Sequence, residues 1–204
     1  MRTYTVTLTG KMPLLMHADN IDWADEMDAW KSVPANKKMS RAGDDRTPAF
    51  RWLGSLYHDG TSVAIPNDNL MRAFMEGGAT VPVPGGKNGK SFKAQTQSGM
   101  LVDGTHWPLV VNDSTIDVVP LLALKTEMDF AAHRQAAERA GFSLFVKRAK
   151  IGQSKHIRVR PMFDKWSATG AVHVWDDQIT VDALRDIVTQ AGLYKGLGDW
   201  RPGG

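Results

Sequence analysis

Alternation of apolar and polar residues is clearest near the N-terminus, where it predicts a β-strand. In residues 3–9, Tyr4, Val6 and Leu8 share one face and threonines the other, which is the period of a half-buried strand. A turn at Asp59 and Gly60 leads into another apolar run. Further strands are predicted at residues 61–65, 143–150, 156–163 and 168–175, and a hairpin at residues 100–111 around Asp103 and Gly104.

Apolar residues at helical spacing predict four helices, at residues 21–32, 69–76, 127–141 and 181–191. Pro66 stops the preceding strand, and Asn67 or Asp68 is expected to cap the helix that follows. Thr180 is expected to cap the last helix, whose apolar residues form one stripe.

The remaining segments have loop composition. Residues 34–48 form a long predicted loop, and residues 79–99, rich in Pro, Gly and Lys, read as an exposed insertion. We therefore expect an α+β fold, with a mainly antiparallel sheet and helices on one face. The expected organisation is a single domain over residues 1–204, with insertions around 18–48 and 79–99.

Composition narrows the class of protein. Of the 204 residues, 42% are hydrophobic and 23% charged, which is ordinary for a globular chain. The absence of cysteine excludes disulfides, cysteine-ligated zinc and a catalytic thiol, and fits a cytoplasmic location. The sequence contains no run of about 18 apolar residues, so it predicts no membrane span.

Basic residues gather in the second half of the chain, although the net charge is only +3. Arg158 and Arg160 share one face of a predicted strand, an arrangement suited to phosphate oxygens. The candidate phosphate contacts of this region are Lys147, Arg148, Lys150, Lys155, His156, Arg158 and Arg160. The interpretation would fail if Arg158 and Arg160 were paired with acids and no open cationic groove remained. A solvated, charge-rich hairpin is the alternative.

Two further segments are candidates for nucleic-acid contact. Lys87, Lys90 and Lys93 lie in the predicted insertion and could form an arm that orders on nucleic acid. The C-terminal "KGLGDWRPGG" offers the candidates Gly196, Gly198, Trp200 and Arg201. Glycine lets backbone N–H groups approach phosphates, while tryptophan and arginine can stack on bases. A helix end followed by a surface loop is the alternative interpretation.

Signals of catalysis are weak. The six histidines do not occur at metal-ligand spacing, and no nucleotide-binding loop or nucleophile motif is present. We therefore expect a protein that is not an enzyme and that has no metal and no cofactor. The runner-up is an endoribonuclease, whose base could be His17 or His58 or whose metal could sit on Asp44 and Asp45.

The stretch "SVAIPNDNLMRAFMEGG" resembles the "IPGSSLKGALR"-like segment of the RAMP superfamily of CRISPR-associated proteins. "GLGDWRPGG" is similar to their C-terminal glycine-rich loop, and the first strand followed by "PLLMH" is similar to their start. The matching positions are Ile65, Pro66, Asn69, Leu70 and Arg72 in the middle motif, Gly196, Gly198 and Arg201 in the loop, and His17 after the first strand. Asp68 and Asn69 stand where the family has Ser-Ser, and the acid Asp68 is unfavourable beside phosphate.

The resemblance implies an RRM-like (ferredoxin-like) palm and a role like that of the RNA-coating backbone subunits of effector complexes. We expect the chain to bind single-stranded guide RNA through phosphates without sequence specificity, in many copies along a ribonucleoprotein filament with other effector subunits. Target nucleic acid is a further expected partner. A third alternative is a phage-encoded adaptor that mimics an effector subunit.

Overall fold

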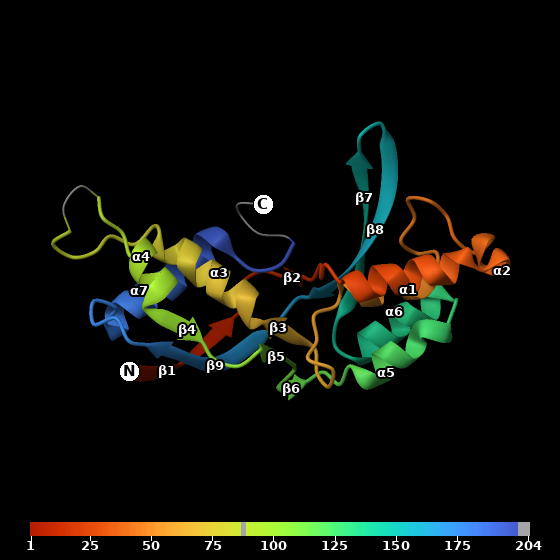
Figure 1. Ribbon diagram of the computed structural model, residues 1–204. Helices are drawn as coiled ribbons and strands as arrows, with labels where there is room; N and C mark the ends of the chain where they lie inside the picture. The colour runs from red at the N-terminus through yellow and green to blue at the C-terminus, as the bar shows by residue number, and fades with distance from the viewer. Residues whose placement is uncertain (87–88, 200–204) are drawn as a thin grey trace. The chain divides into compact units, whose positions relative to one another are not determined.

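The structure is a computed structural model that describes residues 1–86 and 89–199 (Figure 1). The chain forms helices and antiparallel sheets, so the α+β class is confirmed. It divides into two compact units: unit 1 comprises Met1–Thr9, Ala64–Leu109 and the residues from Ser167 onward, and unit 2 comprises Gly10–Val63 and Val110–Trp166. The expectation of one domain over residues 1–204 stays a prediction.

Strand β9 lies at the centre of the sheet of unit 1. It pairs antiparallel along its whole length with β1, and three of its residues also pair antiparallel with β4. Because a strand has two edges, β1 and β4 lie on opposite sides of β9 and run parallel to each other. The strands of this unit are β1 (Arg2–Thr9), β3 (Ala64–Pro66), β4 (Met100–Val102), β5 (His106–Val111) and β9 (Ser167–Val174), in the order β1-β9-β5-β3 with β4 also on β9.

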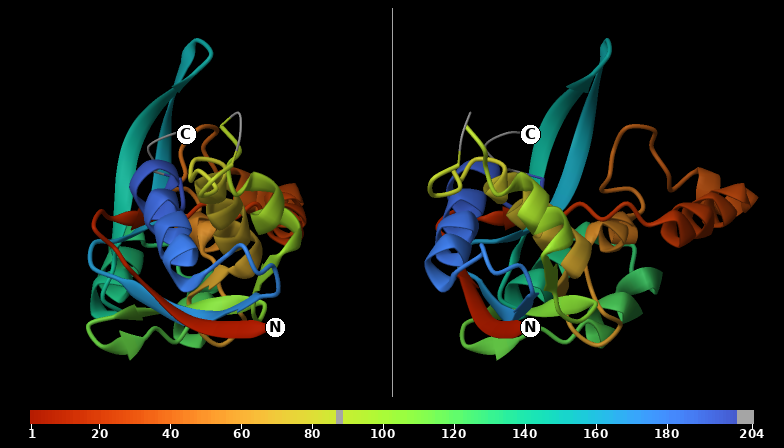
Figure 2. Two further views of the ribbon diagram at one scale, coloured as in Figure 1. Left: turned by 90° about the vertical axis from the view of Figure 1, so that its left-hand side faces the viewer. Right: turned by 60° about the vertical axis from the view of Figure 1, so that its left-hand side comes forward.

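Helices cover one face of this sheet (Figure 2). They are α3 (Asn67–Gly78), α4 (Lys93–Ser98) and α7 (Val181–Gln190), which continues into a π-helical turn at Ala191–Lys195. The Thr180 hydroxyl accepts the Ala183 N–H at 3.2 Å, which confirms the predicted cap. Phe74 of α3 meets Trp107 of β5 edge-on in the core.

Unit 2 is built around a long hairpin and several helices. Its elements are β2 (Leu14–Leu15), α1 (Ile21–Ser32), α2 (Pro34–Lys37), a 3₁₀ helix η1 (Ala49–Ser55), β6 (Ser114–Thr115), α5 (Val119–Leu122), a second 3₁₀ helix η2 (Ala123–Thr126), α6 (Phe130–Arg139), β7 (Ser143–Ile151) and β8 (Ser154–Phe163). The last two residues of β5 also fall in this unit and pair with β6.

A buried aromatic cluster holds the helices of unit 2 against the base of the hairpin. Trp52 of η1 contacts Phe142, which stacks on Phe163 of β8. The Trp52 indole N–H donates to Nδ1 of the fully buried His133 at 3.1 Å, and Nε2 of that ring lies 3.0 Å from the Glu127 carbonyl. Both ring nitrogens are thus used within the core.

Three local predictions were wrong. Helix α3 begins at Asn67 without a side-chain cap, because the Asn67 amide donates instead to the Gly104 carbonyl. The expected hairpin at residues 100–111 is absent because its two strands do not pair with each other: β4 pairs with β9, and β5 lies between β9 and β3. Part of the expected exposed loop at residues 79–99 is helix α4, whose Gln95 and Thr96 are buried.

In the described ranges, no helix has the length and apolar character needed to cross a membrane.

Candidate nucleic-acid interface

The outer half of the β7–β8 hairpin carries the predicted cluster of cations. This half extends away from the helices of unit 2 (Figure 1). The register places Lys147 opposite Arg158 and Lys150 opposite Lys155. Arg148 lies two positions before Lys150, on the same face as the lysine pair. The side chains of Arg148, Lys150 and Lys155 are exposed, and no acid pairs with them in the described residues.

Like charges that face each other across two strands are destabilising, by up to roughly 1 kcal/mol per pair. The pair of Lys150 and Lys155 therefore costs stability when the protein is alone, whereas Arg158 of the other pair is compensated by Asp45. A polyanion placed along the hairpin would remove that repulsion, so the arrangement is one that a nucleic acid would stabilise.

Arg158 and Arg160 are not free, which contradicts the expectation that both are open to phosphate. Their Nη1 atoms lie 3.1 and 3.4 Å from the carboxylate of Asp45, and Nε of Arg51 lies 3.6 Å from the same group. The Asp45 side chain is only 5% exposed. Two conditions together would reject the phosphate interpretation: pairing of these arginines with acids, and the lack of an open cationic groove. The first condition is therefore met.

The loop before η1 brings Asp45 to the strand. The Ile157 N–H donates to the Gly43 carbonyl at 2.7 Å, and the Asp45 N–H donates to the Ile157 carbonyl at 3.0 Å, so the loop joins the edge of β8. Gly43 has a φ of 75°, and a Cβ there would lie 2.7 Å from the imidazole of His156. His156, a predicted RNA contact, thus packs against this loop.

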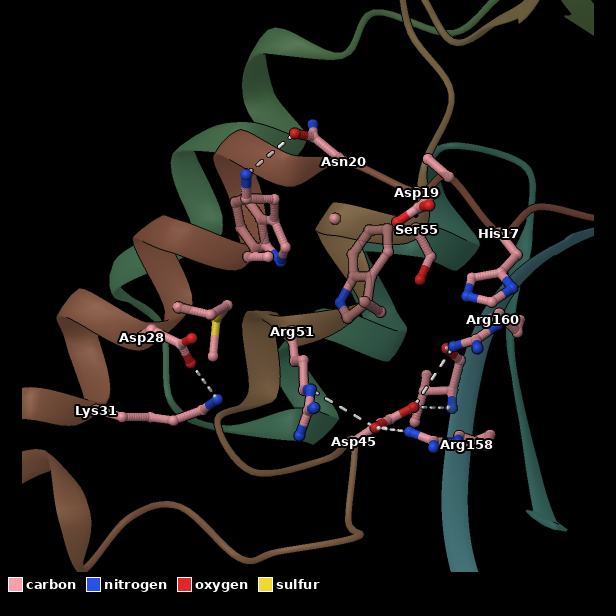
Figure 3. Close-up of a pocket in the computed structure, with 17 residues that line it drawn as sticks. His17, Asp19, Asn20, Asp28, Lys31, Asp45, Arg51, Ser55, Arg158 and Arg160 are labelled. Carbon is pink, nitrogen blue, oxygen red and sulfur yellow. Dashed lines mark hydrogen bonds and ion pairs between the residues drawn. The ribbon is translucent and has the colours of Figure 1, made fainter. Parts of the chain in front are cut away.

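A pocket of about 350 Å³ opens beside the arginine cluster (Figure 3). Helix α1, η1, β8 and the segment after β2 line it. Arg51 approaches Asp45 from η1 and Arg158 approaches from β8, while His17 lies beside Arg160 (Figure 3). On the α1 side, Lys31 pairs with Asp28 at 2.9 Å.

The neighbouring Asp44 has its own partner. Nη2 of Arg46 lies 2.8 Å from its carboxylate. The hydrogen bond from the Arg46 side chain lowers the pKa of Asp44 below its ordinary value of 3.8, although burial acts in the opposite direction. Both acids of the runner-up metal hypothesis therefore have arginine partners.

Within residues 1–86 and 89–199, no group of three His, Cys, Asp or Glu side chains is placed so that it could hold a metal ion. His58 accepts the Gly60 N–H at Nδ1, 3.2 Å away, and the carbonyl of His17 accepts the Tyr57 hydroxyl at 2.9 Å. Whether either histidine acts as a base stays a prediction.

The other candidate contacts belong to unit 1. Lys90 and Lys93 are exposed, and Arg72 on α3 pairs with Glu76 at 3.1 Å. Gly196 and Gly198 have φ values of 67° and 79°, which is the backbone region that favours glycine. Lys87, Trp200 and Arg201 lie outside the described residues. The predicted sites thus form two groups, one in each unit.

Sequence reasoning missed Arg51, because a single arginine between Phe50 and Trp52 has no basic neighbour to mark it.

Comparison of the chain with protein-family models, with curated proteins and with solved structures gave no match.

Proposed function

We propose that the chain binds single-stranded RNA through its phosphates, without sequence specificity, in the manner of the RNA-coating backbone subunits of CRISPR effector complexes. The observation that carries the proposal is the outer hairpin, where Arg148, Lys150 and Lys155 share one exposed face and have no acidic partner in the described part of the chain. Phosphate contacts carry no information on base identity, so affinity should be similar for unrelated sequences.

The topology of unit 1 supports the RRM-like part of the proposal. Strands β1 and β4 are parallel, with β9 between them and α3 preceding β4 in the chain. The split βαβ unit of ferredoxin-like folds has the same order of two parallel strands, an intervening strand and a connecting helix. Helix α7 follows β9, as the second helix follows the third strand in the βαββαβ order. We correspondingly propose that many copies of the chain assemble along one guide RNA.

The arginines on Asp45 limit which residues carry the binding. Arg158 and Arg160 are partly used within the protein, so the proposed phosphate contacts move outward along the hairpin to Arg148, Lys150 and Lys155. Neutralising three phosphates of a single strand should contribute about 2 to the slope of log affinity against log salt concentration.

The test compares the wild-type chain with a triple variant, Arg148→Gln, Lys150→Gln and Lys155→Gln. Fluorescence anisotropy with several unrelated single-stranded RNAs, at salt from about 50 to 300 mM, gives the affinity and the salt slope. The triple variant should bind every RNA more weakly and lose about 2 units of slope.

A matched control removes three exposed positive charges elsewhere in unit 2, with Lys37→Gln, Lys38→Gln and Arg139→Gln. It should retain most of the affinity. Equal loss in both variants would mean that only net charge matters, and an unchanged slope in the hairpin variant would refute the proposed surface. Affinities that differ by more than about 100-fold between sequences would contradict backbone recognition.

A further inference from the structure

Strand β1 leaves one side of its backbone without a partner strand. The strand order places β1 at one end of the sheet of unit 1, beside β9 (Figure 2). Within residues 1–86 and 89–199, no backbone hydrogen bond joins the outer side of β1 to another segment. A strand edge of this kind is a template on which another strand can pair.

The hydrogen-bond pattern shows which residues face the free edge. Just after β1, the Gly10 N–H donates to the Trp166 carbonyl at 2.8 Å, which continues the register of β1 with β9. Bonded and non-bonded pairs alternate in an antiparallel ladder, so the even-numbered residues of β1 bond to β9. The N–H and C=O groups of the odd-numbered residues therefore point to the free edge, and these residues are Thr3, Thr5, Thr7 and Thr9.

This edge lacks the features that usually prevent pairing. Edge strands of natural proteins are protected by short length, charged side chains, proline or bulges. Two other strands that end a sheet follow this rule: β3 has three residues and contains Pro66, and β7 carries Lys147, Arg148 and Lys150. Residues 3–9 of β1 contain neither a charge nor a proline, and their pairing with β9 has no bulge.

The core side of β1 is incompletely covered. Tyr4, Val6 and Leu8 lie on the same side of the sheet as Val172 and Ala168 of β9. The two side chains of β9 are fully buried, whereas the three of β1 are only half-buried. Apolar surface thus stays in contact with water along the edge, and a further strand with apolar residues at alternate positions would bury it.

We propose that the edge of β1 pairs antiparallel with β1 of a second copy of this chain, about a two-fold axis beside Val6. The sequence of residues 3–9, TYTVTLT, alternates threonine and apolar residues identically in both directions from Val6. Two-fold pairing requires this property, because the same surface serves both copies. Thr5 then faces Thr7 of the second copy, Tyr4 faces Leu8 and Val6 faces Val6. Threonine pairs and apolar pairs across strands both stabilise a sheet.

The interface goes beyond the proposed RNA binding and does not depend on it. Its residues belong to unit 1, whereas the outer hairpin belongs to unit 2. A contact made mainly by one strand pair lies at the small end of protein interfaces, so the dimer should form reversibly as the protein concentration rises. A two-fold contact is closed, so association should stop at the dimer.

The test is analytical ultracentrifugation of the full chain at about 1–300 µM protein, in about 500 mM salt that removes bound nucleic acid. The double variant Thr5→Lys, Thr7→Lys places two lysines opposite two lysines of the second copy, so its dissociation constant should rise at least about tenfold. The double variant Thr5→Glu, Thr7→Glu should behave alike. An equimolar mixture of the two should dimerise again, because each introduced lysine then faces an introduced glutamate.

Three controls separate the edge from other causes. The variant Gln97→Lys, Gln135→Lys adds the same charge at exposed positions of α4 and α6 and should dimerise like the wild type. Thr5→Pro removes an outward N–H and leaves the bonds to β9 in place, so it should weaken the dimer at least about tenfold without adding charge. The triple hairpin variant should dimerise normally, so failure of the RNA-binding proposal is seen separately.

Amide hydrogen exchange, followed residue by residue by NMR, locates the contact. The N–H groups of Thr5 and Thr7 should be protected only at protein concentrations where the dimer forms, whereas those of Tyr4 and Val6 should be protected at every concentration. A wild type that stays monomeric throughout would overturn the proposal and leave the edge to a strand of a different protein. Equal dimerisation of the lysine and control variants, growth beyond the dimer, or a mixture that stays monomeric would also overturn it.

Discussion

Replacement of Asp45 by Asn should strongly destabilise unit 2. Asn has the same shape and keeps an acceptor for the Val159 N–H, which lies 3.3 Å from the carboxylate. The change therefore removes the charge with little loss of packing. Three guanidinium groups that one carboxylate now holds together would face each other without that carboxylate.

The magnitude follows from the three distances. At 3.1, 3.4 and 3.6 Å and an effective dielectric constant of about 20, each pair is worth roughly 5 kcal/mol before desolvation is subtracted. Removing one partner of a buried ion pair costs about 3–5 kcal/mol in measured cases. Because two of the arginines are 31% exposed and partly screened by water, we expect about 3 kcal/mol, at the lower end of that range.

Urea unfolding, followed by far-UV circular dichroism and tryptophan fluorescence, measures this loss. With an m-value of about 2 kcal/mol/M, the midpoint should fall by about 1.5 M. The control Asp28→Asn removes an exposed pair to Lys31 and should cost less than about 1 kcal/mol. A loss for Asp45→Asn no larger than that of the control would refute the view that this carboxylate organises the arginines.

Two further predictions concern Asp44 and the packing of the sheet. The Arg46 side chain lowers the pKa of Asp44 in the folded state, so the stability that this group contributes is present above its ordinary value of 3.8 and is lost as the pH falls through the folded-state pKa. The difference in unfolding free energy between the wild type and Asp44→Asn should therefore be constant above about pH 5 and shrink below it, and a difference that grows on acidification would contradict the ion pair. Gly170→Ala should cost roughly 3 kcal/mol in thermal or urea unfolding, because a Cβ there would overlap the indole ring of Trp107. The control Gly192→Ala, which meets nothing within 4 Å, should be neutral or slightly stabilising, and equal effects of the two changes would argue against that packing.

Elements with strong local patterns could be predicted from the sequence. The alternation of β1 reappears as alternating burial along Arg2–Thr9, and the cap and apolar stripe of the last helix reappear in α7. These features depend on neighbours within a few positions. Helix α4 escaped prediction because Gln95 and Thr96 are polar by type, and only tertiary contacts bury them.

The candidate site could be predicted only in part, because its decisive contact spans distant positions. Arg158 and Asp45 are 113 positions apart, and Gly43 brings the acid to the strand through backbone hydrogen bonds with Ile157. The spacing of arginines in β8 shows that two of them share a face. It does not show that a loop supplies an acid to that face.

The cost of the arginine cluster is itself an argument for a ligand. A buried ion pair is often no more stable than apolar residues of similar volume, because desolvation offsets its Coulomb energy. One arginine would satisfy the charge of Asp45, yet the fold places Arg51, Arg158 and Arg160 around it, and in the described residues Arg51 and Arg158 engage only this acid. Folding alone does not require both of these arginines, and each keeps N–H donors that suit an anion. The Asp45 carboxylate then positions the three guanidinium groups before a ligand arrives, which lowers the ordering cost of binding.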